Sequence, residues 1–161
     1  YTLWLKRRTA LNIVIGGLAG SFAVLAGAAA IDPGLGPLPV LLALVLFLWT
    51  PPPFLSLAIA NPTDFADSRL PMLPVLLGPE SAARVVLGST VALFVASLLP
   101  LGFGAGPVYA VGALAGGLHF VHKSWLLVRQ PSRSTAMGSF FASLIQLSVL
   151  LVAACIDAFM R

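Results

Sequence analysis

The chain contains five apolar segments that are long enough to cross a lipid bilayer. A spanning helix needs roughly 20 predominantly apolar residues, and the sequence offers such stretches at residues 11–30, 38–60, 85–101, 108–128 and 137–159. Hydrophobic residues make up 59% of the 161 residues, which is more apolar surface than a soluble domain of this size can bury. The sequence therefore predicts an all-α membrane protein with five transmembrane helices, forming a single transmembrane unit over residues 1–161.

Basic residues are concentrated on one side of this predicted bundle. Short connections make consecutive spans antiparallel, so the N-terminal segment and the connections at residues 61–84 and 123–136 share one face. Apart from Arg161, every basic residue lies on that face: Lys6, Arg7, Arg8, Arg69, Arg84, Lys123, Arg129 and Arg133. By the positive-inside rule, we expect the N-terminus and both long loops to be cytoplasmic, in a multi-pass protein of the cell inner membrane. The net charge of +4 then reflects orientation and attraction to membrane lipid, and it requires no nucleic acid.

A proline-broken span leads into a loop that holds two of the five acidic residues. Pro51, Pro52 and Pro53 lack the N–H groups that carbonyls one turn earlier require, which predicts a break in the second span. Asp64 and Asp67 follow, and on one helical turn their spacing directs both carboxylates to the same side. Mg²⁺ prefers oxygen ligands and often shares its shell with phosphate. The pair is therefore a candidate metal site, and a solvated loop is the alternative.

Other polar side chains near the same face are candidates for holding a charged ligand. Asn61 offers an amide oxygen beside the carboxylates, and Asn12 lies in the first span, where an amide without a partner is costly. The Lys6-Arg7-Arg8 cluster suits a diphosphate or a propionate, although such a cluster also serves as an orientation signal. These residues predict a ligand site at the cytoplasmic face.

Two patterns in the last spans have simpler explanations. His119 and His122 lie three residues apart and are candidates to ligate a metal or haem iron, with hydrogen bonding at headgroup level as the alternative. Gly112 and Gly116 lie four residues apart. This spacing of small residues indicates a close approach between two helices.

Three motifs of the chain resemble those of one family. They occur in the order Tyr1-Thr-Leu-Trp-Leu-Lys6-Arg7-Arg8-Thr9 … Asn12-Ile-Val-Ile-Gly16-Gly17, then Trp49-Thr-Pro-Pro-Pro-Phe54, then Asp64-Phe65 … Pro71-Met72-Leu73-Pro74. The chain thereby resembles protohaem IX farnesyltransferases, the haem O synthases of the UbiA-type prenyltransferase superfamily. The resemblance implies a nine-helix bundle, of which this chain matches the last five helices. It also implies an N-terminal half that lies outside this sequence.

The resemblance carries an activity as well as a fold. It implies Mg²⁺-dependent transfer of a farnesyl group from farnesyl diphosphate to the vinyl group of haem b, giving haem O for terminal oxidase biogenesis. Asp64 and Asp67 would be catalytic and would hold Mg²⁺ between carboxylates and diphosphate. The residues expected to bind substrate are Lys6, Arg7, Asn12, Phe54, Asn61 and Arg69.

The chain departs from the family motifs at three places. We call the motif at residues 49–54 the proline box. Pro53 replaces the histidine that the family has in this box, Leu55 replaces the tryptophan that follows it, and residues 23–28 replace a proline-rich run. We expect the chain to be a fragment whose activity alone is in question. Two alternatives remain open: a UbiA-type prenyltransferase with a quinone or chlorin acceptor, and a non-catalytic membrane bundle.

Overall fold

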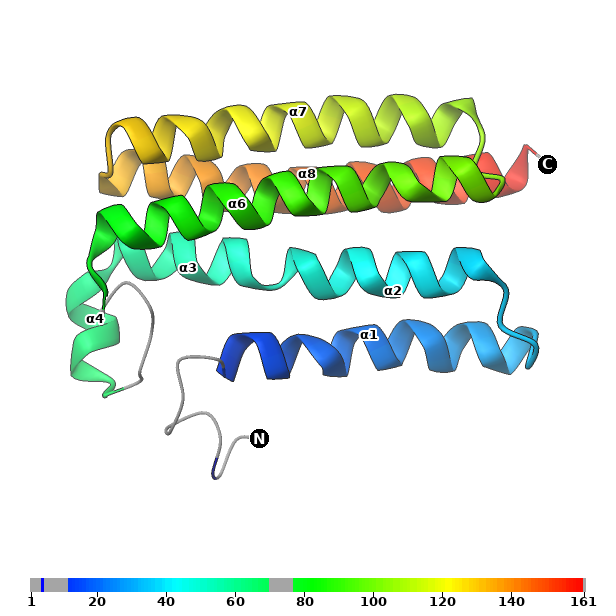
Figure 1. Ribbon diagram of the computed structural model, residues 1–161, viewed down its shortest axis with the longest axis horizontal. Coiled ribbons are helices and arrows are strands. Elements are labelled where there is room, and N and C mark those ends of the chain that lie inside the picture. Colours follow the sequence, from blue (N-terminus) through cyan, green and yellow to red (C-terminus); the bar gives the residue numbers. More distant parts are fainter. Residues whose placement is uncertain (1–3, 5–11, 70–76, 161) are drawn as a thin grey trace.

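The computed structural model describes Trp4 and residues 12–69 and 77–160, and the regular structure of this part of the chain is entirely helical (Figure 1). The helices in chain order are α1 (Asn12–Ile31), α2 (Pro37–Trp49), α3 (Pro51–Ala60), α4 (Pro62–Asp67), α6 (Pro79–Leu98), the 3-10 helix η1 (Leu99–Phe103), α7 (Pro107–Arg129) and α8 (Arg133–Phe159). The long helices run back and forth along one axis, as short connections require.

Four helical stretches of the described part are long and apolar enough to cross a membrane: Asn12–Ile31, Pro37–Ala60, Pro79–Phe103 and Arg133–Phe159. The helix α7 is comparably long, with 23 residues, but it carries His119, His122 and Lys123 and is not among the four. The prediction of an all-α membrane protein is thus confirmed, and the predicted count of five spans is close to the four found.

Two helices begin earlier than the apolar pattern indicates, because local capping extends them. The helix α6 starts at Pro79, which suits the first helical turn, and Glu80 follows it there and favours the helix dipole. The helix α8 starts at Arg133 because Ser132 and Thr135 form a capping box, with the Thr135 N–H donating to Ser132 Oγ at 3.2 Å. The long loop predicted at residues 123–136 is therefore wrong, since only residues 130–132 separate α7 from α8.

The proline box breaks the second span between α2 and α3, as predicted. The Thr50 N–H donates to the Phe47 carbonyl at 3.3 Å, which replaces the donor that Pro51 cannot supply. The Thr50 hydroxyl donates to the Leu46 carbonyl at 3.0 Å. Just before the break, Trp49 Nε1 donates to a carbonyl of α8 at 2.9 Å. The Thr50 N–H and hydroxyl thus bond two carbonyls that precede the break, as a membrane interior requires.

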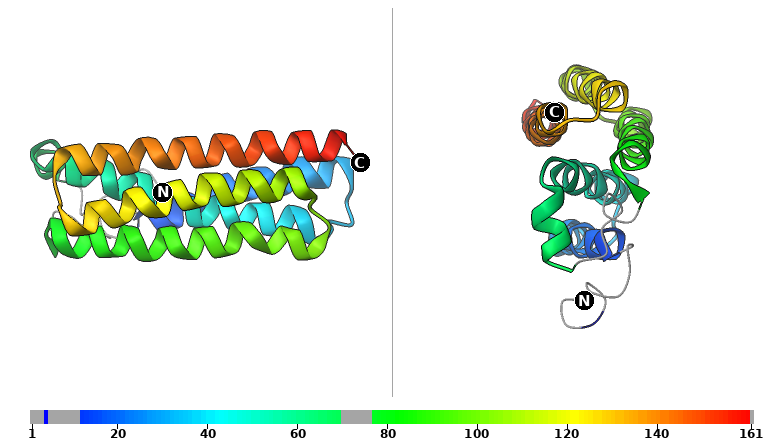
Figure 2. Two further views of the ribbon diagram at one scale, coloured as in Figure 1. Left: turned by 90° about the horizontal axis from the view of Figure 1, so that it is seen from above. Right: turned by 90° about the vertical axis from the view of Figure 1, so that its left-hand side faces the viewer.

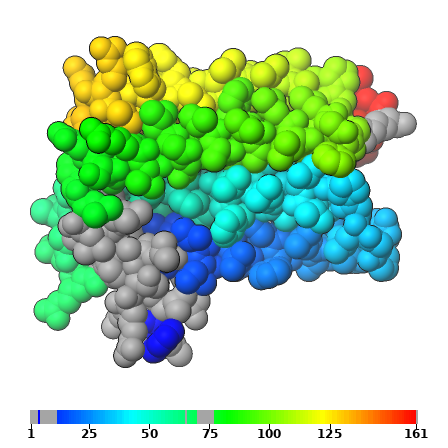
Figure 3. Space-filling view, in the orientation of Figure 1, coloured from blue at the N-terminus to red at the C-terminus, as the bar shows by residue number. Residues whose placement is uncertain are grey.

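The helices α3, α6, α7 and α8 form a four-helix group, and α1 lies on the opposite side of α2 and α3 (Figure 2). Within this group α7 packs against α8 and α6, and α3 packs against the same two helices. The long helices lie side by side across the face shown in Figure 3. Large apolar side chains are exposed on the protein, as expected where lipid replaces water, among them Phe22, Val95, Val111, Leu118 and Val152.

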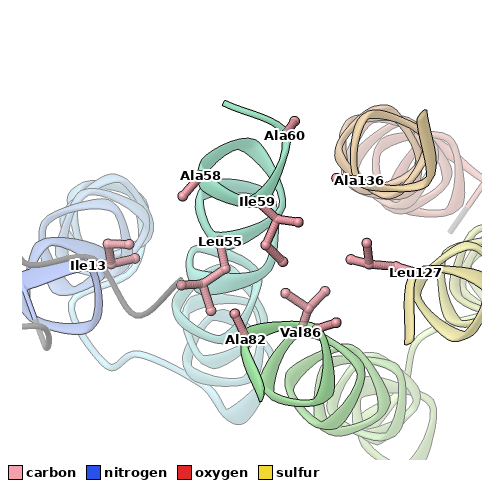
Figure 4. Packing of buried hydrophobic residues seen from close by; sticks show 10 residues of the cluster. Ile13, Leu55, Ala58, Ile59, Ala60, Ala82, Val86, Leu127 and Ala136 are labelled. Atoms are coloured by element: carbon pink, nitrogen blue, oxygen red, sulfur yellow. The ribbon is translucent and has the colours of Figure 1, made fainter. Parts of the chain in front are cut away.

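Small residues dominate the packing of the four-helix group near α4. The buried cluster there draws on α1, α3, α6, α7 and α8 (Figure 4) and consists of Ile13, Leu55, Ala58, Ile59, Ala60, Ala82, Ala83, Val86, Leu127 and Ala136. Half of these side chains are alanine methyl groups, which let helix backbones approach closely.

Gln146 is a buried amide without hydrogen bonds in the middle of α8. Its side chain is 1% exposed, and neither Nε2 nor Oε1 has a partner. An unsatisfied buried polar group costs about 1–3 kcal/mol. We therefore expect Gln146→Leu to raise the free energy of unfolding by about 1–2 kcal/mol, measured by thermal unfolding in detergent.

Gln130→Leu is the matched control, because Gln130 is exposed just beyond the end of α7. Its replacement relieves no buried amide and should leave the unfolding temperature unchanged. A Gln146→Leu variant that is less stable than the unmodified protein would contradict this prediction. It would mean that the Gln146 amide forms hydrogen bonds in the membrane.

Candidate functional site

One end of the bundle gathers the start of α1, the junction of α3 and α4, the start of α6 and the connection at residues 130–132 (Figure 1). We call it the α4 end. All lysines and arginines of the described ranges lie towards it: Arg69, Arg84, Lys123, Arg129 and Arg133. At the opposite end stand Asp32 and Asp157. The charge separation expected from the sequence is therefore present along the bundle axis.

Asp64 and Asp67 lie on one turn of the short helix α4. Pro62 occupies its first turn, and the Ser68 N–H donates to the Asp64 carbonyl at 3.1 Å, which closes the turn. Both aspartate side chains are exposed. Their spacing thus places two carboxylates on one turn at the α4 end, where a hydrated cation and phosphate oxygens have access.

Asn61 and Arg69 flank this turn. Asn61 ends α3 and precedes α4 with φ −128° and ψ 63°, and its Nδ2 donates to the Leu57 carbonyl at 3.2 Å. That bond leaves the amide oxygen as the acceptor atom of the group. Arg69 has φ 54°, which is unusual for a residue other than glycine. Its N–H donates to the Ala66 carbonyl at 3.1 Å, so the chain turns sharply just after Asp67.

The other proposed substrate-binding residues lie on α1 and α3 or outside the described residues. Asn12 is 2% exposed at the first position of α1, which starts at the same end. Phe54 is 47% exposed on α3, two helical turns before Asn61. Lys6, Arg7 and the motif at residues 71–74 are outside the described residues.

A small pocket that sequence reasoning missed also opens near the α4 end. Its volume is about 170 Å³, and it is lined by Ala58, Ile59, Pro62, Pro79, Pro131, Ser132 and Arg133. Small-molecule sites usually enclose about 300–1,000 Å³, so this pocket is too small for a tetrapyrrole. Two of its prolines, Pro62 and Pro79, start helices, and Pro131 lies just before the N-cap of α8.

The residues of the α4 turn fit one type of metal ion. Within the described ranges, no group of three or more His, Cys, Asp or Glu residues is placed to hold a metal. Mg²⁺ is commonly bound by one or two carboxylates, with waters and substrate phosphates completing its shell. Asp64 and Asp67 therefore suit a magnesium ion that arrives with a diphosphate better than a metal enclosed by protein alone.

The two histidines of α7 are separate from this turn. His119 and His122 are exposed, and Figure 2 shows α7 and α4 on opposite sides of α3 when the bundle is viewed along its axis. Near them the Arg129 guanidinium lies over the Trp125 ring at 4.8 Å from its centre, an arrangement typical of a membrane interface. The imidazoles and the two carboxylates do not form one site.

The antiparallel apolar helices and the segregated charges define a multi-pass helical membrane protein. The UbiA prenyltransferase family matches residues 1–145. The chain therefore belongs to the UbiA prenyltransferase family, which agrees with the resemblance found in its motifs.

Relatives of known name are similar over nearly the whole chain. It is 59% identical over 98% of its length to "Protoheme IX farnesyltransferase 2" of Paramagnetospirillum magneticum, covering 54% of that protein. It is 50% identical over 98% of its length to "Protoheme IX farnesyltransferase 1" of the same organism, covering 56%. It is also 43% identical over its full length to "Protoheme IX farnesyltransferase" of Azoarcus sp., covering 54%. The chain thus spans about half the length of these relatives. No solved structure matches it.

Proposed function

We propose that this protein acts in the farnesylation of haem b, transferring a farnesyl group from farnesyl diphosphate to a vinyl carbon. The names of the relatives support the reaction. The observation that carries the proposal for this chain is the pairing of Asp64 and Asp67 on one exposed turn, at the end where the described basic residues gather. The carboxylates suit a metal ion, and the basic side chains suit the phosphate oxygens of a diphosphate.

Prenyl transfer must ionise an allylic diphosphate, and the negative charge that develops on the leaving diphosphate dominates the barrier. Mg²⁺, when bound, neutralises that charge. Asp64 and Asp67 would hold the ion, with the Asn61 amide oxygen beside them. Arg69, together with Lys6 and Arg7, would donate to phosphate oxygens. Charged groups that are in place before the reaction stabilise the negative charge where it develops.

The remaining roles concern the prenyl chain and the acceptor. The exposed ring of Phe54 would offer its face to the allylic cation, and the farnesyl tail would lie on apolar helix surface. Asn12 would help bind substrate at the start of α1. We propose that an N-terminal half of the length seen in the relatives completes the site, since the described pocket is too small for haem.

We further propose that the α4 end faces the cytoplasm across the cell inner membrane. The five described basic residues lie towards that end, and cytoplasmic loops of membrane proteins carry an excess of lysine and arginine.

The test is transfer by the full-length gene product in lipid nanodiscs, supplied with farnesyl diphosphate and haem b. We expect mass spectrometry to show haem that has gained a farnesyl group. EDTA should abolish the reaction and excess Mg²⁺ should restore it, because without a divalent cation the two carboxylates repel the diphosphate. The 161-residue chain tested in parallel should be inactive.

Two further acceptors separate the alternatives. Transfer to a quinone precursor or a chlorin, with haem b left unchanged, would overturn the proposed acceptor and keep the family's chemistry. Absence of transfer to all three acceptors, from a folded full-length product, would leave only the non-catalytic bundle.

A further inference from the structure

Four buried hydroxyl groups form a continuous hydrogen-bonded chain across the four-helix group. Each comes from a different helix and is at most 1% exposed: Ser56 of α3, Ser139 of α8, Ser124 of α7 and Thr90 of α6. The Oγ–Oγ distances are 3.2 Å from Ser56 to Ser139 and 3.3 Å from Ser139 to Ser124, and Ser124 Oγ lies 3.0 Å from Thr90 Oγ1. All three bonds join different helices.

The donor and acceptor of every bond in this hydroxyl chain follow from Thr90, its last member. The Thr90 hydroxyl donates to the Val86 carbonyl at 2.7 Å, so its single hydrogen is used and it accepts from Ser124. The Ser124 hydrogen is then used in turn, and Ser124 accepts from Ser139. Ser139 accepts from Ser56. Since a hydroxyl has one hydrogen to donate, the order is fixed from α3 to α6.

This order excludes a proton relay. The chain ends at a backbone carbonyl, which accepts a hydrogen bond but cannot pass a proton on. Every hydroxyl hydrogen is donated to a partner inside the bundle. The hydroxyl chain therefore links helices to one another. In apolar surroundings, hydroxyl bonds between helices are a main source of specific association.

The hydroxyl chain binds α3 to the other helices, and α3 leads directly to the helix α4 that carries Asp64. The helix α3 is only 10 residues long, and the break at Thr50 separates it from α2. At its other end Asn61 joins it directly to α4. Ser56 lies five residues before Asn61, so a shift of α3 along its neighbours would carry α4 with it.

Several of the surfaces that face α3 offer no directional contact. Its neighbours near the α4 end include Ala82, Ala83 and Ala136, which present only methyl groups. The bond from Ser56 to Ser139 is directional and therefore adds a contact that favours one register of α3. The same bond ties α3 to α7 and α6, because Ser139 continues the chain.

We propose that the hydroxyl chain is a positioning device, which sets the register of α3 and so holds Asp64 and Asp67 at a fixed place relative to α6, α7 and α8. Its effect on substrate rests on the proposed function. Its effect on geometry does not, so the two can be tested apart.

Ser56→Ala is the most selective variant, because it removes only the bond to α3 and keeps the bonds among α6, α7 and α8. Ser143→Ala is the matched control. Ser143 is also buried, one turn from Ser139 on α8, but its hydroxyl donates to Phe140 of its own helix. Alanine fills nearly the same volume as serine in both variants, so cavity effects are small.

The geometric readout is the distance between spin labels at exposed Thr63 of α4 and Ser134 of α8, measured by pulsed electron paramagnetic resonance in nanodiscs. The exposed native Cys155 is replaced by alanine in every variant. We expect one narrow distance distribution in the parent and in Ser143→Ala, and a shifted or broadened one in Ser56→Ala. Equal distributions in all three would overturn the proposal, as would an equal change in both variants.

The substrate readout is the affinity of the full-length gene product for farnesyl diphosphate with Mg²⁺. Ser56→Ala should weaken it roughly three- to tenfold, the range of one interhelical hydroxyl bond, and Ser143→Ala should not. Unchanged affinity in a Ser56→Ala variant whose label distance has shifted would overturn the link to the carboxylates. If the parent binds no diphosphate, the proposed function fails while the label distances still decide the positioning role.

Discussion

Asp64→Asn in the full-length gene product should reduce farnesyl transfer about a hundredfold or more, the loss seen when one preorganised charge-stabilising group is removed. The amide keeps the shape of the carboxylate but loses the charge that would hold Mg²⁺ beside the diphosphate. Asp64 is exposed on α4, so the substitution should change the free energy of unfolding by no more than about 0.5 kcal/mol. Initial rates and thermal unfolding of the same preparation separate the two effects.

Asp32→Asn provides the control for charge. Asp32 is also exposed, but it lies at the opposite end of the bundle, where its Oδ1 accepts from the Gly34 N–H at 3.0 Å. We expect its rate of transfer to equal that of the parent. Full activity in Asp64→Asn would remove Asp64 from the site, and a matching loss in Asp32→Asn would indicate a general effect of net charge.

Gly112→Leu should destabilise the bundle by about 3 kcal/mol, the upper part of the usual range for overpacking. A Cβ atom at Gly112 would stand 2.5 Å from the Cβ atom of Ala153 and 3.4 Å from the Val149 carbonyl oxygen. Neither atom can move without its helix, so α7 and α8 would have to separate. The measurement is the unfolding temperature in detergent, followed by circular dichroism.

Gly27→Leu makes the same change where there is room. A Cβ atom at Gly27 of α1 would meet nothing within 4 Å, and the residue is exposed. Its unfolding temperature should stay the same or rise slightly, because leucine favours a helix more than glycine does. If Gly112→Leu were as stable as Gly27→Leu, the close approach of α7 and α8 would be wrong.

Apolar length and proline positions were enough to predict the helices and the break at Thr50. The same reasoning gave a span at residues 108–128 and a long connection at residues 123–136, so that Lys123 was assigned to both. In the structure α7 continues through Lys123 to Arg129, since a long basic side chain at a membrane edge can extend its charge towards water while its stem stays on the helix.

The carboxylate turn was visible in the sequence because Asp64 and Asp67 are neighbours on the chain. The hydroxyl chain was not, since Ser56, Thr90, Ser124 and Ser139 come from four separate segments. Their meeting depends on the relative register of four helices, and single serines in apolar segments do not reveal it. The pocket lined by Pro62, Pro79 and Arg133 escaped prediction for the same reason.

The segregation of charge along the bundle has a consequence in an energised cell. Among the described residues, five basic side chains lie towards the α4 end together with the acidic Asp64, Asp67 and Glu80, whereas Asp32 and Asp157 lie at the other end. Carrying an elementary charge across a potential of 100 mV requires about 2.3 kcal/mol. A membrane that is electrically negative on the α4 side therefore draws the net positive end towards it and opposes inversion of the bundle. Dissipating the proton motive force during synthesis would remove this bias while leaving the interactions between helices unchanged.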